Sequence, residues 1–222
     1  RLYGCFRGDE LRAGVAVGLV GPNAAGHPES SLTPYLGLLL PPVSDRVVTT
    51  QSTTKEITAV VAAFLRREFE SVHFRFPPEV VDLQPFLWRG FQAGVRYTYR
   101  LKLENLDAVL AGMDATRRRN LRAAEKDGVL VVSDAPFTTM LELTEKTFHR
   151  QGREVGFRSG AVRVQAALAG ANRCRAFVAT DPSGRALGGV WIVWDERRAY
   201  YLIGGHDETA GSANATALAM WK

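Results

Sequence analysis

Three short apolar segments near the C-terminus, joined by brief turns, constrain the fold of this chain more than any other feature. They lie at 174–180, 186–194 and 199–204. The stretches between them, 181–184 and 195–198, are made of Asp, Pro, Gly and charged residues that favour turns. Consecutive strands with such short connections pair antiparallel. A glycine-containing loop then leads into helix formers from about Ser212, so we predict a β-β-β-loop-α order.

Hydrophobic periodicity predicts an alternation of helices and strands in the rest of the chain. The predicted helices are 55–70, 106–113, 116–126, 134–151 and 161–171, and the predicted strands are 15–20, 71–76, 96–103 and 129–132. The fold class is therefore mixed α/β (α+β), with mostly antiparallel sheets flanked by helices.

Composition excludes several classes of protein. With 46% hydrophobic and 23% charged residues, the chain is typical of a folded domain and not of a disordered or collagen-like one. Its longest apolar stretches, 15–20 and 36–40, are too short for a transmembrane helix. Cys5 and Cys174 form neither a disulfide framework nor a zinc pattern, so we expect no metal and a reducing, cytoplasmic location.

A cluster of cations marks the predicted helix 116–126. Arg118, Arg122 and Lys126 stand four residues apart and so project from one face, whereas Leu121 and Ala124 turn to the other side and can pack inward. The cations either form a solvated surface or contact phosphate groups of a ligand.

Six motifs in a fixed order resemble the FemAB-like branch of the GNAT acyltransferase superfamily. They read TPYLG at 33–37, PFLWRGF at 85–91, RYTY at 96–99, RRRNLRAAEK at 117–126, TFHRQG at 147–152 and YYLIGG at 200–205. The β-β-β-loop-α order is similar to the acyl-CoA-binding core of GNAT enzymes. The resemblance implies two tandem GNAT-like halves, at 1–104 and at 105–222.

The resemblance also implies a bacterial-type N-acyltransferase. Its donor would be an acyl-CoA such as acetyl-CoA, or an aminoacyl-tRNA, and its acceptor an amine on a small molecule or a cell-envelope precursor. One departure from GNAT enzymes concerns the donor: the loop HDETAGSAN at 206–214 lacks the usual Arg/Gln-x-x-Gly-x-Gly/Ala spacing. The donor therefore stays open between the two classes.

Acyl transfer needs donors that polarise a carbonyl and a group that accepts a proton, and the end of the last predicted strand offers both. Gly204 and Gly205 can expose backbone N–H groups, although they can equally serve only to turn the chain. Tyr201, His206 and Asp207 lie near the same edge as candidates for the proton, with Tyr201 and His206 as our predicted catalytic side chains.

Phosphate groups of the donor are expected at two places. One is the start of the last helix, at Gly211, Ser212 and Ala213, where unpaired N–H groups favour an anion. The other is the face formed by Arg118, Arg122 and Lys126, defined above.

Two further expectations complete the sequence-based view. A noncatalytic RNA- or partner-binding module that uses helix 116–126 is the alternative function, but that helix lacks the aromatic residues on which bases stack. The last predicted helix has no glycine, asparagine or proline stop signal before Lys222, which leads us to expect a fragment of a longer protein.

Overall fold

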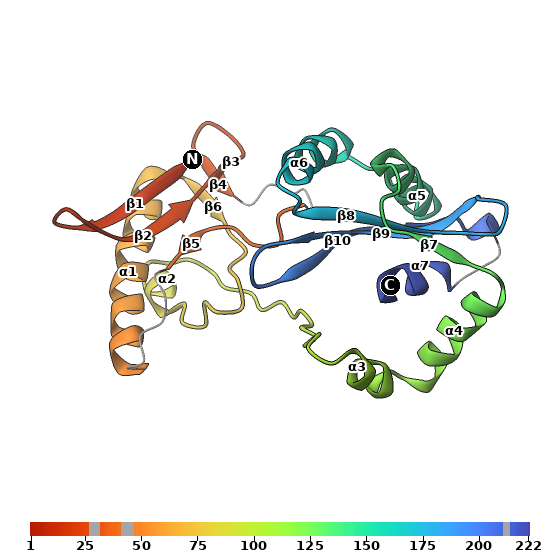
Figure 1. The fold of residues 1–222 in the computed structure, drawn as a ribbon. Helices are drawn as coiled ribbons and strands as arrows, with labels where there is room; N and C mark the ends of the chain where they lie inside the picture. Colours follow the sequence, from red (N-terminus) through yellow and green to blue (C-terminus); the bar gives the residue numbers. More distant parts are fainter. Residues whose placement is uncertain (27–31, 41–46, 211–213) are drawn as a thin grey trace. The chain divides into compact units, whose positions relative to one another are not determined.

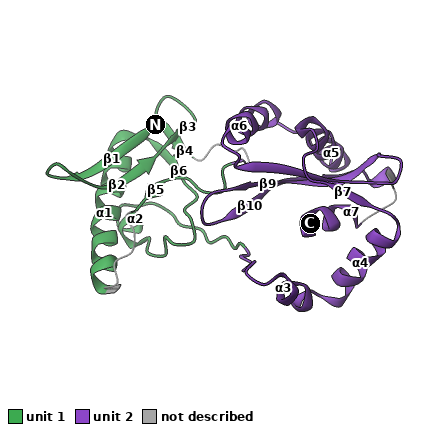
Figure 2. Cartoon of the chain, in the orientation of Figure 1, with its two compact units in different colours: residues 1–29, 33–98 green, residues 30–32, 99–222 purple. Residues whose placement is uncertain are grey.

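The computed structural model of the chain describes residues 1–26, 32–40, 47–210 and 214–222 (Figure 1). These residues belong to two compact units (Figure 2). Unit 1 comprises residues 1–29 and 33–98, and unit 2 comprises 30–32 and 99–222. The division between the units thus falls after residue 98, a few residues before the predicted domain boundary at 104.

Unit 1 contains two small sheets and a long helix. One sheet has the order β1-β2-β5, from Leu2–Arg7, Glu10–Ala16 and Leu38–Leu39; the other has the order β3-β4-β6, from Gly18–Leu19, Ala24–Gly26 and Ser71–His73. Helices α1 (Val47–Glu68) and α2 (Gln84–Leu87) complete the unit. Its core contains Val15, Val61, Leu65 and Phe86, two of which belong to the predicted 55–70 helix. Val60 of the same helix, which its spacing also predicts to be apolar core, is 57% exposed.

Unit 2 is built on a four-stranded antiparallel sheet with the order β10-β9-β8-β7. The strands are β7 (Leu130–Val132), β8 (Cys174–Thr180), β9 (Ala186–Trp194) and β10 (Ala199–His206). The helices are α3 (Leu106–Gly112), α4 (Ala115–Lys126), α5 (Phe137–Arg150), α6 (Arg158–Gly170) and α7 (Ala215–Trp221), with a 3-10 turn at Glu208–Ala210. The predicted meander of β8, β9 and β10 is confirmed.

Helices cover both faces of this sheet (Figure 1). On one face, α5 and α6 pack around Met140, Leu141 and Trp191, all of which are fully buried. On the other face, α4 and α7 pack around Leu121 and Leu218. The mixed, mostly antiparallel α/β class predicted from the sequence is therefore the observed one.

Aspartate side chains form the two turns of the meander. Asp181 accepts hydrogen bonds from the backbone N–H groups of Ser183 and Arg185, at 2.9 and 3.0 Å. Asp195 does the same for the N–H groups of Arg197 and Arg198. Such Asx turns satisfy the turn backbone locally. The hydroxyl of Ser183 and the backbone N–H groups lower the pKa of Asp181, and backbone N–H groups lower the pKa of Asp195.

The predicted strand at 96–103 is wrong. Residues 92–103 form neither helix nor strand, and Tyr97 and Tyr99 are 92% and 97% exposed. The sequence alternates apolar and cationic residues as a strand would, but a strand also needs a neighbour to complete its backbone hydrogen bonds. Within the part of the chain that the structure describes, this segment pairs with no strand.

Strand β10 approaches helix α5 so closely that a side chain at Gly205 has no room. A Cβ atom at this position would overlap the backbone of Leu143 and Thr144. Gly205 itself is buried. Helix backbone cannot yield as a flexible side chain can, so the glycine is required by the packing of strand against helix.

We therefore expect Gly205→Ala to lower the free energy of unfolding by about 1–3 kcal/mol, because the overlap forces α5 away from the sheet. Urea denaturation measures the change. Gly156→Ala is the matched control, since a Cβ at Gly156 meets no atom within 4 Å. Equal stability of the two variants would contradict this packing role.

Candidate active site

Strand β10 forms an edge of the unit 2 sheet and carries a bulge in its middle. Among the described residues, its only neighbouring strand is β9. Tyr201 lies opposite Ile192 and Ile203 lies opposite Trp191, so Leu202 has no counterpart on β9. An extra residue of this kind twists the strand locally and disturbs the alternation of side chains between the two faces.

The hydrogen bonds that follow the bulge fix which backbone groups point outward. The N–H of Asp207 donates to the carbonyl of Leu187 in β9, at 2.8 Å. The N–H of His206 points the other way and donates to Oγ1 of Thr147 on α5, at 2.9 Å. Because alternate residues of a strand direct their N–H groups to the same side, the N–H of Gly204 points away from β9.

The two glycines of β10 are required for different reasons. Gly205 is needed for the contact with α5 described above. At Gly204, a Cβ atom would overlap the hydroxyl of Tyr201, so the tyrosine ring lies across this glycine. Of the two glycines that the sequence predicts at this site, Gly205 is thus required by packing against α5, whereas Gly204 lies beneath the hydroxyl of Tyr201.

Tyr201 presents its hydroxyl at this edge. The residue is 54% exposed, and within the described part of the chain its hydroxyl has no hydrogen-bond partner. Partial desolvation raises the pKa of the phenol above its ordinary value near 10. At neutral pH the group is therefore protonated, which makes Tyr201 a hydrogen-bond donor and not a base.

His206 follows the two glycines and contacts a cation. Its Nε2 lies 3.3 Å from Nη1 of Arg150, whose guanidinium also reaches Glu208 at 3.3 Å. Arginine can only donate, so Nε2 accepts this bond and the ring proton belongs on Nδ1. In this arrangement Nε2 of His206 is engaged with Arg150.

Asp207 is the centre of a polar cluster at the end of β10. It is 6% exposed, and its Oδ2 accepts from Lys146 Nζ at 2.7 Å and from Arg185 Nη2 at 3.1 Å. Its Oδ1 accepts from the N–H and the hydroxyl of Thr209, at 3.0 and 2.6 Å. The bonds from Lys146, Thr209 and Arg185 lower the pKa of Asp207 well below its usual range.

This cluster resolves one of the alternatives left open by the sequence. A carboxylate with so low a pKa and four donors around it is a poor proton acceptor. Asp207 therefore links the chain after β10 to α5 and to the turn before β9. Sequence analysis missed its partners Lys146 and Arg185, which come from α5 and from the turn before β9.

Comparison with known proteins agrees with this geometry. The family model described as "Acetyltransferase (GNAT) domain" matches residues 111–222, half of the chain. The chain belongs to this GNAT family. The solved structure titled "Crystal structure of FemX" has the same fold, with a TM-score of 0.63 and 12% sequence identity. The match covers 100% of this chain and 74% of that chain. No curated protein sequence matches significantly.

These findings confirm the FemAB-like GNAT fold that the six motifs predicted, and they identify the chain as an N-acyltransferase. The family match covers nearly all of unit 2, including the β10 edge. Neither the family match nor the FemX structure specifies the donor, the acceptor or the roles of individual residues.

The predicted phosphate-binding residues at the start of the last helix cannot be placed. Gly211, Ser212 and Ala213 lie outside the described residues, and α7 of the GNAT domain is described from Ala215 onward. Their role in donor binding remains a prediction.

The basic face of α4 lies on the other side of the sheet from α5. Leu121 and Ala124 are buried against α7, as predicted. Arg118, however, donates from Nη1 to the carbonyl of Ala111 at 2.8 Å and to that of Met113, so it closes the end of α3. Its neighbours Arg122 and Lys126 are exposed, and Glu125 pairs with Lys222 at 3.1 Å.

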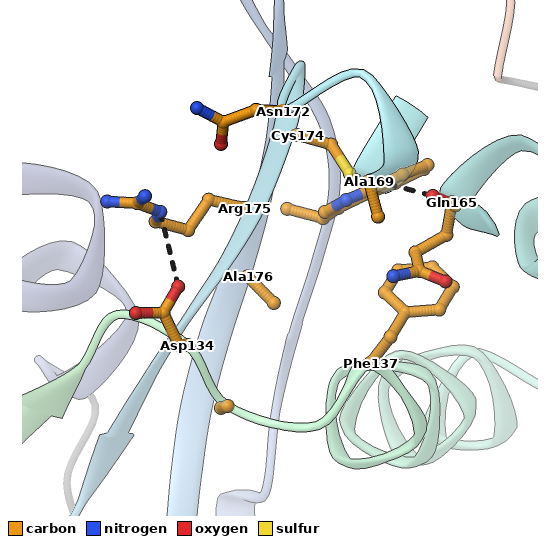
Figure 3. A pocket seen from close by; sticks show the side chains of 10 residues that line it. Asp134, Phe137, Gln165, Ala169, Asn172, Cys174, Arg175 and Ala176 are labelled. Atoms are coloured by element: carbon orange, nitrogen blue, oxygen red, sulfur yellow. Dashed lines mark hydrogen bonds and ion pairs between the residues drawn. The ribbon is translucent and has the colours of Figure 1, made fainter. Parts of the chain in front are cut away.

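A pocket of about 280 Å³ lies elsewhere in the GNAT domain, between α6, β8 and the start of α5 (Figure 3). Asp134 and Arg175 form an ion pair of 3.3 Å at its wall, and Phe137 and Trp191 provide apolar surface. Cys174 also lines it, and burial raises the pKa of this thiol, which disfavours the reactive thiolate. Strand β9 separates this pocket from β10, so it is distinct from the candidate active site.

The residues that the structure describes contain no group of three or more His, Cys, Asp or Glu side chains that could hold a metal ion. In the same part of the chain, no helix has the length and apolar character that a membrane span requires.

The Asp207 cluster predicts a defined pH dependence. A lowered carboxyl pKa stabilises the folded state above the unfolded pKa of about 3.9, and this contribution is lost as pH falls further. Urea unfolding between about pH 6 and pH 2 should therefore lose more stability in the wild type than in Asp207→Asn. Lys146→Met, which removes the largest cause of the shift, should fall between them. Parallel pH profiles would contradict this assignment.

Arg118 and Arg122 of α4 should differ in how much each contributes to the stability of the protein. We expect Arg118→Ala to lower the free energy of unfolding by about 1 kcal/mol, because the carbonyls at the end of α3 lose their donor. Arg122→Ala, from the exposed position one turn later, should change it by less than about 0.5 kcal/mol. Thermal denaturation distinguishes them, and equal losses would show that the bonds of Arg118 contribute nothing.

Proposed function

We propose that this chain transfers an acyl group from an acyl-CoA thioester to an amine. The observation that carries the proposal is the free edge of β10, where the N–H of Gly204 points outward next to the bulge. A backbone N–H held at a fixed position can polarise a donor carbonyl without reorganising during the reaction. Membership of the GNAT family supports the thioester as donor.

The reaction needs no redox partner. The neutral amine attacks the carbonyl carbon, so an N–C bond forms and the carbonyl π pair moves onto oxygen. When the tetrahedral intermediate collapses, the C–S bond breaks and its electron pair leaves with the sulfur. The proton lost by the amine nitrogen ends on that thiolate, through solvent, which gives an amide and a free thiol.

An aminoacyl-tRNA remains the second possible donor, because its ester carbonyl would need the same polarisation. The exposed cations Arg122 and Lys126 could then contact RNA phosphates. Two observations favour the thioester: α4 carries no aromatic residue for base stacking, and Arg118 is engaged with α3. The same observations count against a noncatalytic RNA-binding module.

The acceptor that fits this proposal is a primary amine, either on a small molecule or on a cell-envelope precursor as the FemAB-like fold suggests. Acyl-CoA thioesters and aminoacyl-tRNAs are both made in the cytoplasm, so we place the reaction there.

Direct binding tests the donor. We expect acetyl-CoA to bind with micromolar affinity in isothermal titration calorimetry, and total tRNA to bind weakly with an affinity that falls steeply as salt rises. Free CoA is the control that separates nucleotide binding from recognition of the acyl group. Tight, saturable tRNA binding without acetyl-CoA binding would replace the proposed donor with the second one.

A further inference from the structure

The bulge in β10 brings Tyr201 and Gly204 to the same face of the strand. In a regular strand, residues three apart point to opposite faces. Because Leu202 is an extra residue without a counterpart on β9, the alternation is reset between the two positions. The tyrosine hydroxyl consequently lies where a Cβ of residue 204 would be.

This placement puts two hydrogen-bond donors next to each other at the sheet edge. One is the outward N–H of Gly204, whose direction follows from the bond between the N–H of His206 and Thr147. The other is the Tyr201 hydroxyl, which has no hydrogen-bond partner among the described residues and stays protonated at neutral pH. Only glycine at 204 allows the hydroxyl to come this close.

The two other polar side chains predicted for this edge have partners of their own. Asp207 accepts from Lys146, Arg185 and Thr209, as described above. The Nε2 atom of His206 faces Arg150. The Tyr201 hydroxyl is the side-chain donor that lies directly over Gly204.

We propose that the Tyr201 hydroxyl and the Gly204 N–H together form an oxyanion hole for the acyl carbonyl of the donor. This inference rests on the proposed function and adds a catalytic role for Tyr201 to it. As the amine attacks, the carbonyl oxygen takes up the π electron pair and becomes negative, and both donors strengthen their bonds to it. Tyr201 keeps its proton throughout, so the atom balance given above is unchanged.

Paired ligands test the inference by binding alone. Acetyl-CoA carries the carbonyl oxygen, whereas the thioether S-ethyl-CoA lacks it and is otherwise of similar shape. We expect Tyr201→Phe to weaken binding of acetyl-CoA by about 2- to 10-fold, as for the loss of one hydrogen bond, and to leave binding of S-ethyl-CoA unchanged. Gly204→Ala should displace the hydroxyl and show the same selective loss.

Tyr200→Phe is the matched control, because it removes a hydroxyl from the adjacent position on β10 and should not affect the ratio of the two affinities.

Infrared spectroscopy of acetyl-CoA labelled at the thioester carbonyl with carbon-13 gives a second readout. The carbonyl stretch should shift to lower frequency on binding to the wild type and shift less in Tyr201→Phe.

The result that would overturn this inference differs from the result that would overturn the proposed function. If Tyr201→Phe weakens both ligands equally, or neither, the hydroxyl does not bind the carbonyl and this inference is overturned while the proposed function stands. If the wild-type protein binds no acetyl-CoA, the acyl-CoA donor is overturned and the oxyanion hole for it falls as well.

Discussion

The contact between strand β10 and helix α5 fixes the end of the strand that carries the candidate active site. Gly205 lies against the backbone of α5, His206 exchanges hydrogen bonds with Thr147, and Asp207 binds Lys146. The last two residues of the strand and the residue that follows them are therefore held by one short segment of α5, from Leu143 to Thr147. Gly204 directly precedes this anchored segment, so its outward N–H is held on a rigid support, as catalysis by preorganised dipoles requires.

The sequence predicted what is encoded locally. The meander of β8, β9 and β10 was predictable because Asp181 and Asp195 build their turns from neighbouring residues. The prediction of a strand at 96–103 was wrong because alternation of apolar and cationic residues indicates two faces but does not supply a neighbouring strand. The ion pairs of Asp207 could not be predicted for a related reason. Lys146 and Arg185 are 61 and 22 residues away in sequence, and the folded sheet with α5 packed on it brings them to Asp207.

The candidate site itself was predicted as a set of residues but not as an arrangement. Tyr201, Gly204, Gly205 and His206 were all chosen from one strand end, yet their roles depend on register. A bulge is defined by the register against a partner strand, so it cannot be read from the sequence of one strand. Without the bulge, Tyr201 would face away from Gly204. For the cations of α4 the predicted periodicity was correct, but the bond of Arg118 to a backbone carbonyl of α3 was not predictable from the α4 sequence alone. Their contact with donor phosphates stays a prediction.

The Asx turns of the meander also bear on how the protein folds. Each closes a hairpin between strands adjacent in sequence, so little chain entropy is lost when β8, β9 and β10 pair. β7 pairs with β8 across the whole α5–α6 segment, which makes it a slow, non-local contact. We therefore expect the edge that carries the candidate active site to form early in folding and the opposite edge, at β7, to complete the sheet.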